Sequence, residues 1–113
     1  MFGLFGSKKY NEMSAAAFAE ALKSNKDVVL LDVRSAGEFS SGHIKSAKNI
    51  DVQSASFQAN VQKLDKTKQY LVYCRSGMRS GSACSTMASL GFTNLVNLKG
   101  GIMSWTSSGF PVQ

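Results

Sequence analysis

The sequence predicts an α/β fold in which helices cover both faces of a parallel sheet. Continuous apolar runs, rich in β-branched and aromatic residues, lie at 28–31 and 70–73 and are typical of strands buried on both faces. Segments with apolar residues at helical spacing separate these runs. This alternation over 113 residues indicates one domain with right-handed crossovers.

The first half of the chain begins with a predicted helix over 13–22. Ser14 is placed to cap it, and Met13 and Phe18 are placed to pack against each other around that cap. The strand at 28–31 then ends in polar residues. A helical turn at 35–39, a loop at 40–44 and a short edge strand at 48–50 are expected to complete this half.

In the second half, apolar side chains recur at helical spacing over 54–64, which predicts another amphipathic helix. The strand at 69–73 leads through a short loop into a helix, and Gly91 is placed to end that helix. The remaining expected elements are a strand at 94–98 and a terminal helix that opens at 100.

Composition and charge argue against several classes of function. The net charge is +6, yet the lysines are spread along the chain, so a solvated surface and a small anionic substrate are favoured over nucleic-acid binding. Two cysteines and a single histidine favour neither a disulfide scaffold nor a zinc site, and they suggest a reducing, cytoplasmic location. No run is long enough for stable membrane insertion. Residues 1–10 are expected to be a flexible extension before a domain at 11–113.

The most informative stretch is 70–80, where an apolar strand ends at Cys74 and a loop with two arginines leads into a helix. Cys74 is therefore expected at the carboxyl end of a strand and just before a helix N-terminus, where free N–H groups favour an anion. Such surroundings lower the pKa of a thiol below its ordinary value of about 8.5. A buried strand-end cysteine beside a solvated basic loop is the alternative interpretation.

Several motifs occur together in a characteristic order. They are the Val29–Arg34 strand followed by Glu38-Phe39, then Gly42-His43-Ile44 with Ala47–Ile50, then the Cys74 loop, and finally Leu98–Gly101 with Trp105. In this order the chain resembles a single-domain rhodanese from about Met13 to Pro111. The loop is similar to the C-R-x-G-x-R pattern of thiosulfate-type sulfurtransferases. Ser46 and Asp51 depart from the glycine and proline of many relatives.

The resemblance implies a mostly parallel, five-stranded sheet and a reaction that needs no cofactor or metal. Cys74 is expected to take a sulfane sulfur from a donor such as thiosulfate and to hold it as a persulfide, which cyanide or a thiol, including a protein thiol, then collects. The expected substrate-binding residues are Arg75, Ser76, Gly77, Met78, Arg79 and Ser80. Asp32 and Arg34 are expected to support the site, with Glu38 as the simplest ion-pair partner for Arg34.

Two other functions remain open. Cysteine-dependent phosphatases and arsenate reductases use a C-x5-R loop, whereas the spacing from Cys74 to Arg79 is C-x4-R, which favours a single sulfur atom over phosphate. A rhodanese-fold binding module without turnover is the second alternative, but such modules usually lose the cysteine. The remaining distinctive side chains are assigned structural roles: Cys84 and Trp105 in the core, and His43 in fixing its loop.

Overall fold

The computed structural model describes residues 9–113, so most of the predicted N-terminal extension lies outside the described residues. One sheet holds five parallel strands in the order β1–β5–β4–β2–β3. This confirms the predicted α/β fold with its five-stranded parallel sheet. The strands are β1 (Asn11–Met13), β2 (Val29–Asp32), β3 (Lys48–Asn49), β4 (Tyr70–Tyr73) and β5 (Leu95–Leu98).

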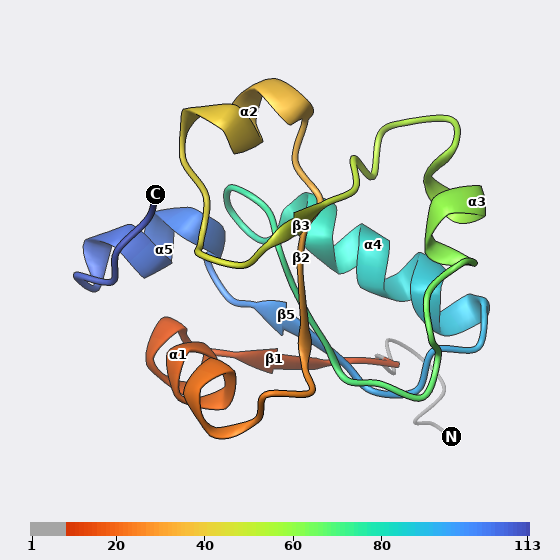
Figure 1. Ribbon diagram of the computed structural model, residues 1–113, viewed down its shortest axis with the longest axis horizontal. Helices are drawn as coiled ribbons and strands as arrows, with labels where there is room; N and C mark the ends of the chain where they lie inside the picture. Colours follow the sequence, from red (N-terminus) through yellow and green to blue (C-terminus); the bar gives the residue numbers. More distant parts are fainter. Residues whose placement is uncertain (1–8) are drawn as a thin grey trace, which may run out of the picture.

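Helices lie on both faces of this sheet (Figure 1). One face is covered by α1 (Ala15–Ser24) and α5 (Gly101–Ser107), whose Phe18 and Trp105 rings meet edge to face. The other face is covered by α3 (Phe57–Val61) and α4 (Met78–Ser89). The short α2 (Ala36–Ser41) follows directly from the carboxyl end of β2. Four crossovers thus bring several loops to the same edge of the sheet.

The position of β4 in the middle of the sheet explains why its sequence is apolar throughout. Tyr70 and Val72 point into the core beneath α3 and α4, whereas Leu71 and Tyr73 point into the core beneath α1 and α5. Successive side chains of a strand face opposite sides of a sheet, and here both sides are covered. Cys74 follows Tyr73 and belongs to the α3–α4 core.

Several elements differ from their predicted extent, three of them most clearly. The strand β1 was not predicted, because it is short, its Asn11 and Glu12 are exposed, and only its pairing with β5 defines it. The helix α3 begins at Phe57 rather than at 54, since the hydroxyl of Ser54 accepts the N–H of Ser56 and closes a local turn. The helix α2 continues through the start of the predicted loop to Ser41.

Several local predictions are confirmed. The hydroxyl of Ser14 caps α1 by accepting the N–H of Ala17, and Trp105 is buried. His43 fixes its loop, because its Nδ1 lies 2.9 Å from the carbonyl oxygen of Phe39 and its ring stacks on the Phe39 ring. Ser46 has φ of 75°, the left-handed conformation that favours the glycine of many relatives.

Candidate active site

The chain turns sharply after β4 so that the sulfur of Cys74 lies inside the loop that leads to α4. Its side chain is 1% exposed. The sulfur accepts the N–H of Gly77 at 3.1 Å and lies 3.3 Å from the hydroxyl oxygen of Ser80. Gly77 has φ of 105°, which places it in the region where side chains are strained. The predicted cradle of polar groups around Cys74 is therefore present.

Two opposing effects set the pKa of Cys74. Burial raises it, because the thiolate loses contact with water. Hydrogen bonds from the Ser80 hydroxyl and from the N–H groups of Ser80, Gly77 and Ser76 lower it, and together they outweigh burial. The net shift is downward, as the position before a helix N-terminus predicts.

The start of α5 holds the other side of the loop. The N–H of Ile102 donates to the carbonyl of Cys74 at 2.9 Å, and that of Met103 donates to the carbonyl of Arg75 at 3.2 Å. Gly101 permits this approach, because a Cβ there would overlap the Arg75 carbonyl and lie 2.6 Å from the Cys74 carbonyl oxygen. Two backbone segments thus orient the loop and leave its N–H groups free for the sulfur.

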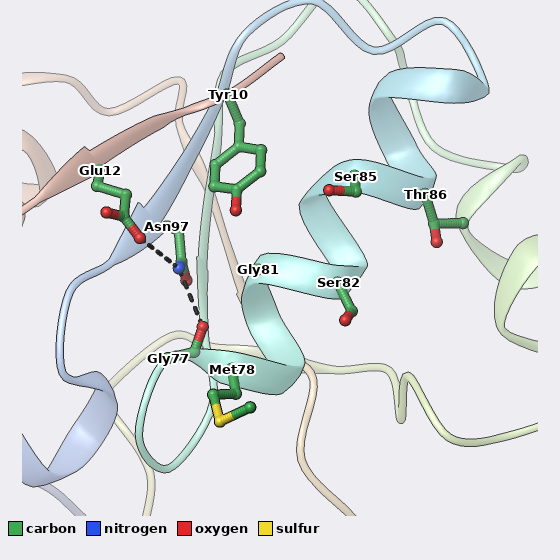
Figure 2. A pocket seen from close by; sticks show the side chains of 9 residues that line it. All are labelled: Tyr10, Glu12, Gly77, Met78, Gly81, Ser82, Ser85, Thr86 and Asn97. Atoms are coloured by element: carbon green, nitrogen blue, oxygen red, sulfur yellow. Dashed lines mark hydrogen bonds between the residues drawn. The ribbon is translucent and has the colours of Figure 1, made fainter. Parts of the chain in front are cut away.

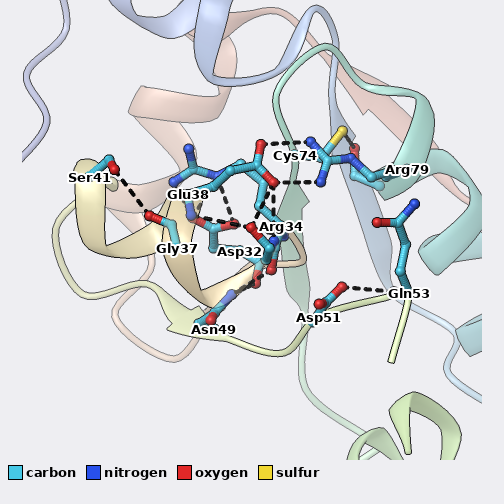
Figure 3. Close-up of polar contacts among 12 residues, drawn as sticks. Asp32, Arg34, Gly37, Glu38, Ser41, Asn49, Asp51, Gln53, Cys74 and Arg79 are labelled. Carbon is cyan, nitrogen blue, oxygen red and sulfur yellow. Dashed lines mark hydrogen bonds and ion pairs between the residues drawn. The ribbon is translucent and has the colours of Figure 1, made fainter. Parts of the chain in front are cut away.

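Arg79, on the first turn of α4, forms a two-pronged ion pair with Glu38 of α2 (Figure 3). The distances are 2.7 Å and 2.9 Å. The guanidinium of Arg79 lowers the pKa of Glu38 from 4.5 to about 2, although burial opposes the shift and Ser35 assists it. Glu38 thereby fixes the direction of an arginine next to Cys74 and offsets part of its charge.

Asp32 and Arg34 pair with each other rather than with outside partners (Figure 3). The guanidinium of Arg34 approaches the carboxylate of Asp32 to 2.6 Å and also donates to the carbonyl of Gly42 at 2.7 Å. The expected ion pair between Arg34 and Glu38 is therefore wrong. Asp32 is fully buried beside Arg34 on the same strand end, whereas Glu38 is reached by Arg79.

Arg75 and Met78 border two different surface grooves. Arg75 is exposed, and no hydrogen bond or ion pair within residues 9–113 engages its guanidinium. It lines a cleft of about 390 Å³ together with Arg34, Glu38 and Met103. Met78 is 82% exposed and borders a different groove, of about 520 Å³, between β1 and α4 (Figure 2).

Cys84 lies in the same apolar cluster as Cys74 but has no polar cradle. It is fully buried, and burial raises its pKa to about 12. Its predicted position in the packed core is confirmed.

The sequence reasoning gave no role in the site to three residues: Glu38 as the partner of Arg79, Gly101 and Asn97. Asn97 is a buried polar residue in the otherwise apolar strand β5, and that contrast is the signal that could have identified it. Within residues 9–113, no cluster of three acidic, histidine or cysteine side chains is arranged to hold a metal ion. In the same residues, no helix is long and apolar enough to cross a membrane.

Comparison with known proteins agrees with this geometry. The model of the rhodanese-like domain matches residues 14–108. The chain belongs to the rhodanese-like family. A sulfurtransferase of Allochromatium vinosum is 30% identical over 90% of this chain and 94% of its own length. A putative sulfurtransferase of Bacillus subtilis, YtwF, is 35% identical over 88% of this chain and 94% of its own.

A solved structure shows the same fold. The crystal structure of a rhodanese-related protein from Thermoplasma volcanium superimposes on this rhodanese-like domain with a TM-score of 0.81 and 33% sequence identity. The match covers 92% of this chain and 98% of that one. Family match and fold thus agree on a rhodanese-like domain, and the two relatives carry sulfurtransferase names.

Proposed function

We propose that this rhodanese-like protein transfers sulfane sulfur from a small anionic donor such as thiosulfate to cyanide or a thiol through a persulfide on Cys74. The observation that carries this proposal is the Cys74 sulfur in its loop, with the Gly77 N–H at 3.1 Å and the Ser80 hydroxyl at 3.3 Å. These groups favour the thiolate, which is the nucleophilic form. The sulfurtransferase relatives support the same reaction class.

In the first step, the Cys74 thiolate attacks the outer sulfur of thiosulfate. A new sulfur–sulfur bond forms on Cys74 while the donor's own sulfur–sulfur bond breaks, and sulfite leaves with that electron pair. In the second step, cyanide attacks the outer sulfur of the persulfide and leaves as thiocyanate, which restores the thiolate. A thiol acceptor would leave as its own persulfide after losing its proton. Neither step needs a metal, an oxidant or a general base.

Arg75 and Arg79 are proposed to have different roles in the reaction. Arg75 is exposed and its guanidinium is unengaged within the described residues, so it can recruit an anionic donor. Arg79 interacts electrostatically with Cys74 while Glu38 holds it in place, so it can stabilise charge on the departing sulfite. The N–H groups from Ser76 to Ser80 would surround the outer sulfur of the persulfide.

Two further assignments are narrower in scope. The buried Asp32–Arg34 pair is proposed to support the cleft wall beside Arg75, because Arg34 lines that cleft and Asp32 holds Arg34. Met78, at the mouth of the neighbouring groove, is proposed to contact bulkier acceptors rather than thiosulfate.

Intact mass spectrometry of the reduced protein tests the proposal. Incubation with thiosulfate should add the mass of one sulfur atom, the addition should map to Cys74, and cyanide should remove it. Cys74→Ser is the matched control and should gain nothing. Failure of the folded wild-type protein to gain sulfur from thiosulfate and from polysulfide would contradict the proposal and favour a binding module without turnover.

A further inference from the structure

Asn97 lies behind the active loop and connects three of its neighbours. It is 1% exposed, in β5. Its side-chain nitrogen donates to the carbonyl of Gly77 at 3.1 Å and to the carboxylate of Glu12 at 3.2 Å (Figure 2). Its side-chain oxygen lies 2.5 Å from the hydroxyl oxygen of Ser80. Asn97 thus contacts the residue that caps α4 and a residue that contacts the Cys74 sulfur.

These contacts fix the orientation of the amide. The Gly77 carbonyl and the Glu12 carboxylate can only accept hydrogen bonds, so the amide nitrogen must face them. The amide oxygen must then face Ser80, and because that oxygen can only accept, the Ser80 hydroxyl must donate to it.

The Ser80 hydroxyl therefore has two acceptors and only one proton. The Asn97 oxygen is 2.5 Å away and the Cys74 sulfur is 3.3 Å away, on the other side. A neutral thiol accepts hydrogen bonds weakly, so the amide oxygen holds the proton while Cys74 is protonated. A thiolate is a charged and much stronger acceptor, and it draws the same proton toward sulfur.

We propose that Asn97 is a positioning residue that holds the Ser80 hydroxyl away from sulfur until Cys74 becomes an anion. On ionisation the thiol proton leaves to solvent, and the Ser80 proton stays bonded to its own oxygen but turns from the Asn97 oxygen to the sulfur. The amide competes with the thiolate for this proton and thereby limits the acidity of Cys74. The inference rests on the proposed sulfur transfer for its purpose, but its test measures only ionisation.

Titration of Cys74 tests the competition directly, and the change in ultraviolet absorbance on thiolate formation reports it. All variants carry Cys84→Ala so that one cysteine titrates. Asn97→Leu has nearly the same shape and no acceptor, so we expect an ionisation constant about fivefold larger, the equivalent of one ordinary hydrogen bond.

The other charged or titratable groups near Cys74 and Asn97 are Arg79 and Arg75 in the loop and first turn of α4, Cys84 in that helix, Glu38 behind Arg79, and Glu12 of β1, which accepts from the Asn97 amide. All but Cys84 are identical in every protein compared, and Cys84 is absent from all of them. Asn97→Leu leaves every one of these groups in place and removes only the amide.

A structural role for Asn97 makes a different prediction. Loosening the Gly77 turn would move free N–H groups away from sulfur, so Asn97→Leu would make Cys74 less acidic. A decrease in acidity for Asn97→Leu overturns the proposal. Ser80→Ala provides the second test, because without the hydroxyl there is no proton to share. The effect of Asn97→Leu should then disappear, and its persistence in the Ser80→Ala protein would also overturn the proposal.

Discussion

The two cysteines lie in the same apolar cluster and are equally buried, yet their acidities differ in direction. The pKa of Cys74 is lowered, while burial raises that of Cys84 to about 12. Cys84 lies inside α4, where backbone N–H groups are already bonded to carbonyls one turn earlier. Cys74 precedes the same helix, whose first N–H groups have no such partners. Hydrogen bonds from the Ser80 hydroxyl and from free N–H groups, rather than exposure, account for the lower pKa of Cys74.

The largest expected effect comes from replacing the sulfur that lies in the cradle. Cys74→Ser should lower thiosulfate turnover at least about a thousandfold, since a serine hydroxyl stays protonated in the same loop. Steady-state thiocyanate formation measures this, with circular dichroism to check the fold. Turnover close to that of the wild type would remove Cys74 from the role of nucleophile.

The second effect concerns the backbone that shapes the cradle. Gly101→Ala places a Cβ against the carbonyls of Arg75 and Cys74 at φ of 63°, so we expect a loss of about 2–4 kcal/mol in unfolding free energy. The loop should also shift, and the pKa of Cys74 should rise. Chemical denaturation and thiolate titration measure the two effects.

Gly37→Ala is the matched control for this substitution. Gly37 lies in α2, and a Cβ there meets nothing within 4 Å. The change should stabilise the protein by about 0.5–1 kcal/mol through helix propensity alone. Similar behaviour of the two alanine variants would show that the contact between α5 and the loop does not matter.

Cys84 provides the other half of the comparison. Cys84→Ala removes a packed sulfur atom from a fully buried position, so unfolding free energy should fall by about 1–2 kcal/mol. Turnover should stay nearly unchanged, because the pKa of this thiol, near 12, keeps it protonated. A large loss of turnover in a stably folded variant would instead make Cys84 a partner in the chemistry.

The smallest effect is electrostatic and depends on pH. The folded-state pKa of Glu38, about 2, lies below its ordinary 4.5, so its ion pair with Arg79 stabilises the fold above about pH 4.5. This contribution should be lost as pH falls toward about 2. The pair is partly exposed, so Glu38→Gln should cost only about 1 kcal/mol at pH 7.

Denaturation of wild type and Glu38→Gln across this pH range measures the difference. The two stabilities should converge as pH falls from about 4.5 to about 2. A difference that is constant with pH would assign the cost to lost packing instead.

The sequence was sufficient to predict the sheet and the reactive loop because both depend on local patterns. The apolar run at β4, Cys74 at its end and Gly77 in the turn are adjacent in the chain. The pairing of Arg79 with Glu38 joins residues 41 positions apart, and no local pattern indicates it. The nearest candidate, Arg34, is held by Asp32 at the buried strand end.

Long-range contacts also explain why β1 and the contacts of Asn97 were not predicted. The strand β1 exists only because Asn11 to Met13 pair with β5, about 85 residues later. The proposed role of Asn97 depends on its contacts with Glu12, Gly77 and Ser80, which come from β1, the loop and α4. Long-range polar contacts are what the sequence could not supply.

Titration of the two thiols in separate variants tests the central claim most directly. In Cys84→Ala only Cys74 ionises, and its thiolate absorbance should appear below the ordinary cysteine pKa of about 8.5. In Cys74→Ser only Cys84 ionises, and no thiolate should appear until the pH approaches about 12 or the protein unfolds. Ionisation of both thiols over the same range in the folded proteins would contradict the claim that hydrogen bonds from the loop and from Ser80 give two buried thiols different acidities.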